Sequence, residues 1–274
     1  VLNRMCRLLG VALKDKDVFT KLFKALVESS RYDHIAASLP RGFSSHNDGW
    51  GYALEYFHGE AKLAIYKTKR PVWEDEEMWP VFAEPPIVGF VHTRKASRNT
   101  PINTFSAHPF VVMASDGSLI AVSQNGGISK RAVEFLRKTD IKPDDVSDTL
   151  IFAKLLEESY GEAGGDPLER IGRALVRLAC RLEDSGYTGG CMNTIVLHVH
   201  PRSTSLAVLR FIERKRDDRL RYCELYGAEG EWGRAYFSST LAEKLSMGKP
   251  FRRNRVVVVA RVGEEWGEAF SEDL

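Results

Sequence analysis

The sequence predicts an α+β fold in which helices pack outside two β-sheets. Strand-type alternation dominates residues 7–128, apolar residues at helical spacing fill residues 129–183, and strand patterns return from residue 194. Neither a linker nor an internal repeat separates the two halves of the sequence. Strands followed by helices and then by further strands are typical of layered α+β domains, so we expect a single domain of this class.

The first half of the chain begins with an apolar run that predicts a strand over residues 7–13. A helix follows, with Asp17 as its expected N-cap and apolar residues at helical spacing from Val18 to Val27. The other elements expected in this half are a polar loop over 34–48, a hairpin of strands 50–56 and 61–67, a short helix within irregular chain over 71–86, a strand over 87–91, and a second hairpin of 107–113 and 119–127 that ends in a glycine-rich turn.

The second half predicts helices over residues 129–138, 147–159 and 167–183, the last of which begins after Asp166. The second and third of these helices each carry an apolar face, and we expect both to pack on a sheet. Alternation then predicts strands over residues 194–200, 206–213, 220–225, 235–238 and 255–262.

The composition excludes several classes of protein. With 39 Lys and Arg residues against 37 Asp and Glu residues, the net charge is +2, which supplies no basic field for nucleic acid. No phosphate-binding loop or dinucleotide motif occurs, so no cofactor is expected. Charged residues 14–17 interrupt any signal-peptide core, and no window holds the roughly eighteen apolar residues of a membrane helix. We therefore expect no membrane association.

The cysteines and two of the histidines were considered as metal ligands. Cys6, Cys180, Cys191 and Cys223 lack CxxC spacing, which argues against a zinc site and a disulfide scaffold and favours a reducing cytoplasm. His198 and His200 alternate along one expected strand, as two metal ligands would. Because no third ligand is evident, a structural pair is favoured, and no metal is expected.

Cys6 follows Met5 directly and leads into the first apolar run. If the residues before it are removed, Cys6 gains a free amine. An unperturbed terminal amine has a pKa of about 7.7–8. A terminal cysteine then holds a nucleophile and a general base within one residue and needs no separate catalytic histidine. The structural alternative is a buried cysteine on a first strand.

Further polar residues follow the ends of expected strands or begin an expected helix. Attack of a thiol on an amide places negative charge on the carbonyl oxygen, and the Asn125 side-chain amide beside the Gly126 N–H suits an oxyanion hole. Arg94 offers a planar fork for a carboxylate, and Asp148 offers a charge for an ammonium group. Each also has a structural alternative: a simple Asn-Gly turn, a structural or solvated arginine, and an acid favoured by the helix dipole.

Three motifs together resemble a known family. They are MCRLLG at residues 5–10, HNDGWG at 46–51 and AHPF at 107–110. The combined pattern is similar to the class II glutamine amidotransferases of the N-terminal nucleophile hydrolase superfamily. It is most similar to their stand-alone branch, which includes the ergothioneine-pathway amidohydrolase and the yeast glutathione-degradation subunit. The resemblance spans residues 5 to about 160 and implies a four-layer αββα sandwich, whose remaining half the later strands would supply.

The resemblance also implies roles for particular residues. It implies Cys6 as nucleophile with its own amine as base, Arg94 on the α-carboxylate of glutamine with Ser97 at the same wall, Asn125 and Gly126 as the oxyanion pair, and Asp148 on the substrate α-ammonium. The sequence departs from the family at Lys95, where synthetase-linked members usually carry an aromatic residue, and at Arg98, which replaces a common histidine. A different pocket wall at Lys95 implies a γ-amide substituent larger than ammonia.

These observations predict a cysteine amidohydrolase that cleaves the side-chain amide of glutamine or a γ-glutamyl compound through a γ-glutamyl thioester. Ammonia or an amine would be released. The alternative is a non-catalytic γ-glutamyl sensor or regulatory subunit that retains the fold. The expected partners are the small-molecule substrate and an ammonia-acceptor enzyme acting in trans, and the sequence predicts no oligomeric state.

Residues 5–274 are expected to form a single class II glutamine amidotransferase-like domain. Residues 1–4 are interpreted as a leader, a start-site artefact or an expression remnant, with Met5 as the natural start. A methionine before a small cysteine is the context in which an initiator methionine is removed, which would free the Cys6 amine.

Overall fold

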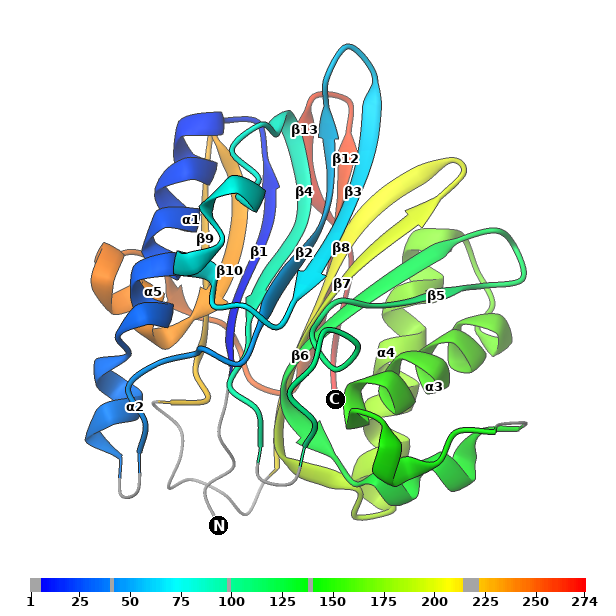
Figure 1. Cartoon of the computed structure of the whole chain (residues 1–274). Helices are drawn as coiled ribbons and strands as arrows, with labels where there is room; N and C mark the ends of the chain where they lie inside the picture. The colour runs from blue at the N-terminus through cyan, green and yellow to red at the C-terminus, as the bar shows by residue number, and fades with distance from the viewer. Residues whose placement is uncertain (1–5, 40–41, 98–99, 138–139, 214–221) are drawn as a thin grey trace. The chain divides into compact units, whose positions relative to one another are not determined.

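The computed structural model describes residues 6–39, 42–97, 100–137, 140–213 and 222–274, so the predictions for residues 1–5 lie outside the described residues. The chain divides into two compact units, each built from two segments. The first comprises Val1–Pro109 and Asp218–Phe251, and the second comprises Phe110–Asp217 and Arg252–Leu274. Each unit contains one antiparallel sheet with its own helices (Figure 1). The single-domain organisation stays a prediction.

The sheet of the first unit has seven strands in the order β11-β9-β10-β1-β4-β2-β3, and all neighbouring pairs are antiparallel. The strands are β1 (Arg7–Leu13), β2 (Trp50–Phe57), β3 (Ala61–Thr68), β4 (Glu84–Thr93), β9 (Leu225–Gly230), β10 (Gly233–Ser238) and β11 (Lys249–Pro250). The helices are α1 (Lys16–Arg31), α2 (His34–Ser38) and α5 (Ser239–Leu245), with 3₁₀ turns η1 (Val72–Glu74) and η2 (Glu76–Met78). Strand β1 is hydrogen-bonded to a neighbour on both sides, so it lies in the interior of its sheet.

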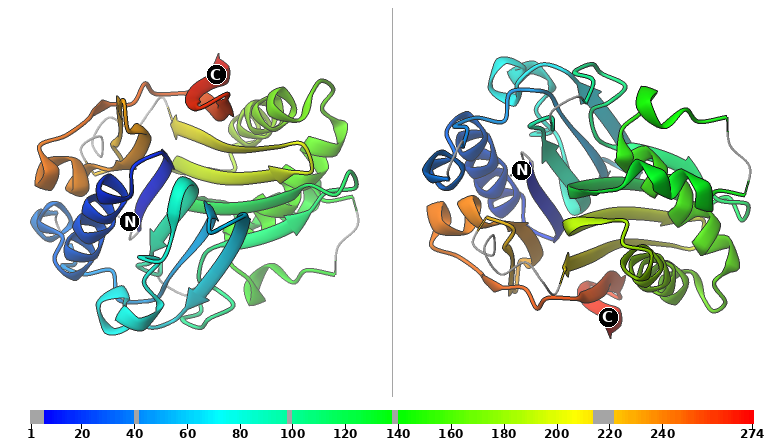
Figure 2. Two further views of the ribbon diagram at one scale, coloured as in Figure 1. Left: turned by 90° about the horizontal axis from the view of Figure 1, so that it is seen from above. Right: turned by 90° about the horizontal axis from the view of Figure 1, so that it is seen from below.

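Alternation along β1 decides which of its side chains meet the helices. Leu9, Val11 and Leu13 belong to the same hydrophobic cluster as Phe19 and Phe23 of α1. Figure 2 shows α1 lying along the sheet with α5 beside it. Since successive side chains of a strand point to opposite faces, the odd-numbered positions of β1 face α1.

The sheet of the second unit has six strands in the order β13-β12-β8-β7-β6-β5, again with antiparallel neighbours throughout. The strands are β5 (Phe110–Met113), β6 (Leu119–Ile128), β7 (Thr188–His200), β8 (Ser203–Ile212), β12 (Arg255–Val262) and β13 (Glu265–Asp273). The helices are α3 (Asp148–Glu162) and α4 (Pro167–Asp184), with 3₁₀ helices η3 (Lys130–Phe135) and η4 (Pro143–Asp145).

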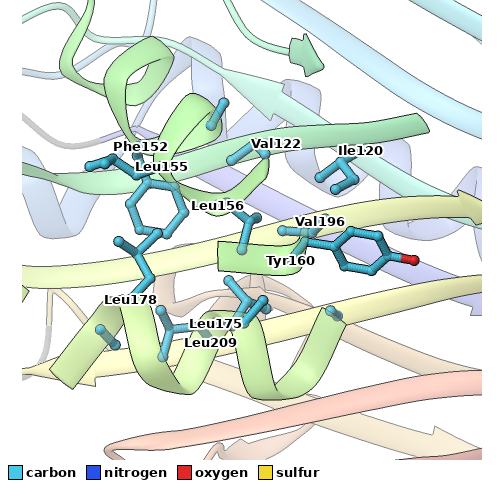
Figure 3. Close-up of a cluster of buried hydrophobic side chains, with 14 of the residues drawn as sticks. Ile120, Val122, Phe152, Leu155, Leu156, Tyr160, Leu175, Leu178, Val196 and Leu209 are labelled. Atoms are coloured by element: carbon cyan, nitrogen blue, oxygen red, sulfur yellow. The ribbon is translucent and has the colours of Figure 1, made fainter. Parts of the chain in front are cut away.

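Helices α3 and α4 lie side by side against this second sheet (Figures 1 and 2). Figure 3 shows the core between them, where Phe152 and Leu156 of α3 and Leu178 of α4 meet Val122 and Leu209 of the strands. All of these side chains are buried. The predicted packing of the two helices on a sheet is confirmed, as is the mixed α and β class with two antiparallel sheets.

Several predictions of local structure are wrong. Asn125 and Gly126 do not form a turn, because β6 continues to Ile128 and stays paired with β7. The helix expected over 129–138 is the 3₁₀ helix η3, and position 138 lies outside the described residues. Ala132 is the one fully buried residue of η3, and Val133 and Phe135 are only partly buried, so this segment gains less from packing than the α-helices do. Residues 71–86 hold two 3₁₀ turns and the start of β4 in place of a short helix.

The region after residue 221 also differs from the prediction. Tyr222 and Cys223 lie in a turn, and strand β9 begins only at Leu225, while residue 220 lies outside the described residues. The sequence also failed to predict α2, α5, β11 and β13. The helices α2 and α5 are too short to show a helical period, and β13 is largely exposed, so it lacks a continuous apolar pattern.

In the part of the chain that the structure describes, no helix is both long and apolar enough to cross a membrane. The cytoplasmic location stays a prediction.

The N-terminus of α1 is capped by Asp15 and not by Asp17. The Asp15 carboxylate accepts hydrogen bonds from the backbone N–H groups of Asp17 and Val18. Asp17 instead lies in the first turn, where it contributes only through the helix dipole.

We expect Asp15→Ala to lower the free energy of unfolding by about 1 kcal/mol, because the substitution removes the side-chain cap of α1. Asp17→Ala is the matched control and should cost no more than about 0.3 kcal/mol, since it removes only a dipole interaction at an exposed site. Urea unfolding followed by circular dichroism measures both values. Equal losses from the two variants would contradict the assignment of the cap.

Candidate active site

The Cys6 thiol lies against the backbone of Lys95. Cys6 directly precedes β1, Lys95 follows the end of β4, and the register pairs Arg7 with Thr93, which brings these two chain ends together. The Lys95 N–H donates to Sγ of Cys6 over 3.4 Å, and the thiol faces the Lys95 carbonyl oxygen at 3.8 Å. The sulfur therefore lies between a backbone donor and a backbone acceptor of the same residue.

Arg94 lies one residue before this contact and is almost fully buried, with 3% of its surface exposed. Its N–H donates to the Gly49 carbonyl oxygen over 2.8 Å, and its own carbonyl oxygen accepts from the Asp48 N–H over 3.1 Å. Ser97, which is half-buried, follows in the same segment. The first unit thus places Cys6, Arg94 and Ser97 at one end of the β1–β4 pair.

The HNDG segment at residues 46–49 holds this end of the pair in place through side chains as well. Asn47 Oδ1 accepts from Lys95 Nζ over 2.6 Å. Asp48 Oδ2 accepts from the Ala96 N–H over 2.9 Å and lies 3.4 Å from Lys95 Nζ. The segment that touches the thiol is therefore fixed by both backbone and side-chain contacts.

A buried cluster of Arg7, Asp33 and His46 contacts the Cys6 main chain. Arg7 Nη2 lies 2.5 Å from Asp33 Oδ2, and His46 Nε2 lies 2.7 Å from the same oxygen. All three side chains are fully buried. Arg7 Nη1 donates to the Cys6 carbonyl oxygen over 3.2 Å, and its guanidinium lies over the Tyr222 ring, 4.3 Å from the centroid. The cluster therefore reaches Cys6 directly.

The protonation states of this cluster follow from its contacts. Burial acts to raise the pKa of Asp33, but the His46 hydrogen bond and the Arg7 charge outweigh it and hold that pKa well below its usual range. Burial lowers the pKa of His46 to about 4, against the opposing effect of Asp33. At neutral pH the cluster is therefore an arginine–carboxylate ion pair with a neutral histidine. Since a carboxylate only accepts, the His46 proton lies on Nε2.

His92 and His108 pack ring against ring, with their centroids 3.9 Å apart. Both rings are buried, and burial lowers the pKa of His108 well below its usual value, with a further contribution from His92.

In the second unit, Asn125 and Gly126 lie within strand β6 at a break in its register with β7. Gly126 has a φ of 115°, and a Cβ at this position would lie 2.0 Å from the Cys191 carbonyl oxygen. Such a position admits only glycine. The register shift between Gly126 and Ile128 forms a bulge in the pairing of β6 with β7. The Asn-Gly pair is thus a feature of the strand, which the sequence had taken for a turn.

Asp148 begins helix α3 and lies beside this bulge. Its Oδ2 accepts from the Ile128 N–H over 3.1 Å, and a Cβ added to Gly127 would lie 2.5 Å from the same oxygen. Its Oδ1 accepts from the Thr149 N–H over 3.0 Å. Burial raises the pKa of Asp148, although these hydrogen bonds oppose the shift. The second unit therefore brings Gly126, Gly127 and Asp148 together, and Asp148 also stabilises the start of its own helix.

Sequence reasoning missed Arg7, Asp33 and His46. The available signal was a charged residue at the start of an otherwise apolar strand, since a buried arginine requires a partner. Asp33 is of a residue type that favours helix N-caps, which was a weak signal in the sequence. In the structure its carboxylate caps α2 by accepting from the Ala36 N–H over 2.9 Å. His46 lies in the HNDGWG motif, but no sequence pattern indicates that it contacts Asp33.

His198 is part of a polar network inside the second unit. Its Nε2 lies 3.2 Å from the Tyr160 hydroxyl, which in turn donates to Asp116 Oδ2 over 2.9 Å. The His198 and His200 rings are 6.4 Å apart. Among residues 6–39, 42–97, 100–137, 140–213 and 222–274, no group of three or more His, Cys, Asp or Glu side chains is arranged to hold a metal ion.

Comparison with solved structures identifies the fold. The chain is similar to the allosteric regulatory enzyme of purine biosynthesis, with a TM-score of 0.55 and 12% sequence identity over 96% of this chain and 48% of that enzyme. The fold is shared. This chain thus spans about half the length of the purine enzyme, and at this identity the likeness shows the fold alone.

A second similar structure is a glutamine aminotransferase class-II domain protein from Silicibacter pomeroyi. Its TM-score is 0.45, with 16% sequence identity over 80% of this chain and 97% of that protein. No protein-family model matches the sequence, and no curated protein is similar to it at the level of sequence.

We expect the free energy of unfolding to fall as the pH drops from about 6.5 to about 4. His46 and His198 both have pKa values lowered to about 4 by burial, so in this range the unfolded chain binds protons that the folded chain does not. Each histidine contributes a slope of about 1.4 kcal/mol per pH unit. The raised pKa of Asp148 acts in the opposite direction at the acid end of the range.

Urea unfolding at pH 4.5, 5.5, 6.5 and 7.5 measures this slope. His198→Gln should remove the share of one histidine and leave a shallower pH dependence. A free energy of unfolding that is constant from pH 7.5 to pH 4.5 would contradict the buried neutral state of these histidines.

Proposed function

We propose that this chain is a cysteine amidohydrolase of the class II glutamine amidotransferase type. Its substrate would be glutamine or a γ-glutamyl compound. The observation that carries the proposal is the contact of the Cys6 thiol with Lys95, one residue after the buried Arg94. A cysteine nucleophile whose contact residue directly follows a buried arginine suits a substrate that carries a carboxylate near its reactive carbonyl. The fold shared with the purine enzyme is compatible with this proposal.

In the proposed reaction, Sγ of Cys6 attacks the side-chain amide carbon of the substrate. The thiol proton passes to the amine of Cys6 and then to the leaving nitrogen, which departs as ammonia or an amine. A γ-glutamyl thioester remains, and water cleaves it to release glutamate and the thiol. Nucleophile and base belong to one residue, so the proposed chemistry uses no cofactor.

The substrate-binding roles extend the same proposal. Arg94, with Ser97 beside it, would bind the α-carboxylate, and Asp148 would bind the α-ammonium. The oxyanion of the tetrahedral intermediate would accept hydrogen bonds from the Asn125 side-chain amide and the Gly126 N–H. Asp148 Oδ2 accepts the Ile128 N–H, and a carboxylate oxygen has capacity for a second donor, which is compatible with an ammonium ligand.

The proposal includes the finer architecture of the chain. The two sheets and their helices would form a four-layer αββα sandwich, and residues 5–274 would act as one domain. Ammonia would be either released or passed to an acceptor enzyme in trans. The Lys95 side chain, bound to Asn47 Oδ1, would form a pocket wall compatible with a γ-amide substituent larger than ammonia.

We expect glutamate release to require a free amine on Cys6. A chain beginning at Met5 and processed to Cys6 should hydrolyse glutamine or a γ-glutamyl amide about 10²- to 10⁴-fold faster than a chain that retains residues 1–5, because an amide nitrogen cannot act as the base. Mass spectra must verify both termini beside the measured rates.

The nucleophile itself is tested with a diazo-ketone analogue of glutamine. This reagent should label the wild-type chain at Cys6 and leave Cys6→Ala unlabelled. Equal hydrolysis rates from the processed and the verified unprocessed chain would remove the amine from the mechanism. Binding of γ-glutamyl compounds without turnover by the processed chain would favour the sensor function.

We expect Arg94→Ala to lower kcat/KM for glutamine by about ten- to 150-fold, which corresponds to the roughly 1.5–3 kcal/mol of a hydrogen bond to a charged group. The matched test is a substrate that lacks the α-carboxylate. With that substrate, wild type and Arg94→Ala should differ little, because the interaction is already absent. An equal loss with both substrates would show that Arg94 does not bind the α-carboxylate.

A further inference from the structure

We propose that Arg7, Asp33 and His46 form a positioning cluster that holds Cys6 in its reactive orientation. The proposal depends on the proposed function only in taking Cys6 as the nucleophile. It concerns the geometry of the thiol, so it is tested without any substrate.

The guanidinium of Arg7 connects two parts of the first unit. One nitrogen, Nη1, donates to the Cys6 carbonyl oxygen over 3.2 Å, while Nη2 lies 2.5 Å from Asp33 Oδ2. The first contact is a hydrogen bond and the second an ion pair, and because the guanidinium is planar and rigid, the two nitrogens keep a fixed separation. Since the Cys6 carbonyl belongs to the peptide plane between residues 6 and 7, holding its oxygen restricts the main-chain torsion of Cys6.

Asp33 is in turn held by donors on both of its oxygens. Oδ2 accepts from His46 Nε2 over 2.7 Å and forms the ion pair with Arg7 Nη2. Oδ1 receives the Ala36 N–H and the Thr240 hydroxyl, each over 2.9 Å. These donors fix the orientation of the Asp33 carboxylate. Because Arg7 pairs with this carboxylate, its position relative to helices α2 and α5 is fixed as well.

The placement of a charge at residue 7 favours a role beyond packing. Arg7 lies on the same face of β1 as Leu9 and Val11, which meet the apolar core of α1. Replacing a buried ion pair with apolar residues of similar volume is often neutral or stabilising. An apolar residue at position 7 would satisfy the packing of this face, but it would not bind the Cys6 carbonyl oxygen.

The cluster and the Lys95 contact restrain Cys6 from two directions. Arg7 holds its carbonyl oxygen, and the Lys95 N–H lies 3.4 Å from its sulfur. If the carbonyl is released, the sulfur loses its fixed distance to this N–H. The thiolate is then less stabilised, and the pH at which Cys6 becomes reactive rises.

The experiment measures carbamidomethylation of Cys6 by iodoacetamide against pH, resolved by peptide mass spectrometry. Arg7→Lys retains a positive charge but lacks the fork, and we expect it to raise the midpoint for Cys6 by about half a pH unit or more, equivalent to about a threefold lower rate below the midpoint. His46→Ala, which frees one side of Asp33, should act in the same direction. His46→Gln should restore the wild-type profile, because its amide still donates to Asp33.

Two controls separate positioning from general loss of structure. Cys180, on helix α4 of the second unit, serves as an internal reference. At a given pH its labelling rate should be the same in every variant. Asp75→Asn alters another buried carboxylate of the first unit, which accepts from Trp50 Nε1 over 2.9 Å and from the Tyr66 hydroxyl over 2.6 Å. It should leave the Cys6 profile unchanged.

A Cys6 midpoint that is unchanged in folded Arg7→Lys would overturn the proposal. If Arg7→Lys fails to fold, the contrast between His46→Ala and His46→Gln decides: equal profiles reject the cluster as a positioning device, and a shift confined to His46→Ala supports it. Absence of glutamine hydrolysis by the wild type would reject the proposed function and leave these labelling results intact.

Discussion

The end of the first unit that carries Cys6 depends on the buried ion pair between Arg7 and Asp33. Both side chains are fully buried, and removing one partner of such a pair typically destabilises a protein by about 3–5 kcal/mol, since the other charge is left without compensation. The pair links the first residue of β1 to the chain between α1 and α2. It therefore ties the start of β1, and with it the residue just before the strand, to this part of the chain.

The HNDG segment contributes to the surroundings of Cys6 from two directions. His46 binds the Asp33 carboxylate, which pairs with Arg7, the residue that donates to the Cys6 carbonyl oxygen. Asn47 and Asp48 bind the segment that carries Lys95, whose backbone faces the sulfur. A short motif far from Cys6 in the sequence thus supports both contacts of this residue. Of its polar side chains, His46 and Asp48 are buried and hydrogen-bonded, as buried polar groups generally are, whereas Asn47 is exposed.

In the second unit, the backbone of β6 allows the Asp148 carboxylate to lie beside the irregular pairing of β6 with β7. The irregular pairing between β6 and β7 requires glycine at position 126, since a side chain would overlap the Cys191 carbonyl oxygen. Gly127 allows the Asp148 carboxylate to approach the strand closely. A substitution of either glycine would disturb the sheet as well as any ligand contact. Function in this unit is therefore better tested through substrates than through these glycines.

The sequence by itself determined most of the regular elements. An apolar run predicted β1, alternation predicted the β2–β3 hairpin and β12, and helical spacing with a capping acid predicted α4, because the apolar residues of each segment follow the period of its element. The same reasoning selected Cys6, Arg94 and Asp148 as candidates by chemical type, and their roles stay proposals. It misread residues 125–127 as a turn, since glycines in a turn and in a bulge look alike in a sequence.

Only the tertiary structure decided which polar residues meet. Arg7, Asp33 and His46 are far apart in the chain, and no local pattern pairs them. Their contacts arise because α1 packs on the odd-numbered face of β1 and brings its C-terminal end to residue 7. Lys95 reaches the sulfur for a similar reason, through the antiparallel register of β1 and β4. Periodicity records which face of an element is buried, whereas a contact between charged groups depends on how separate elements pack together.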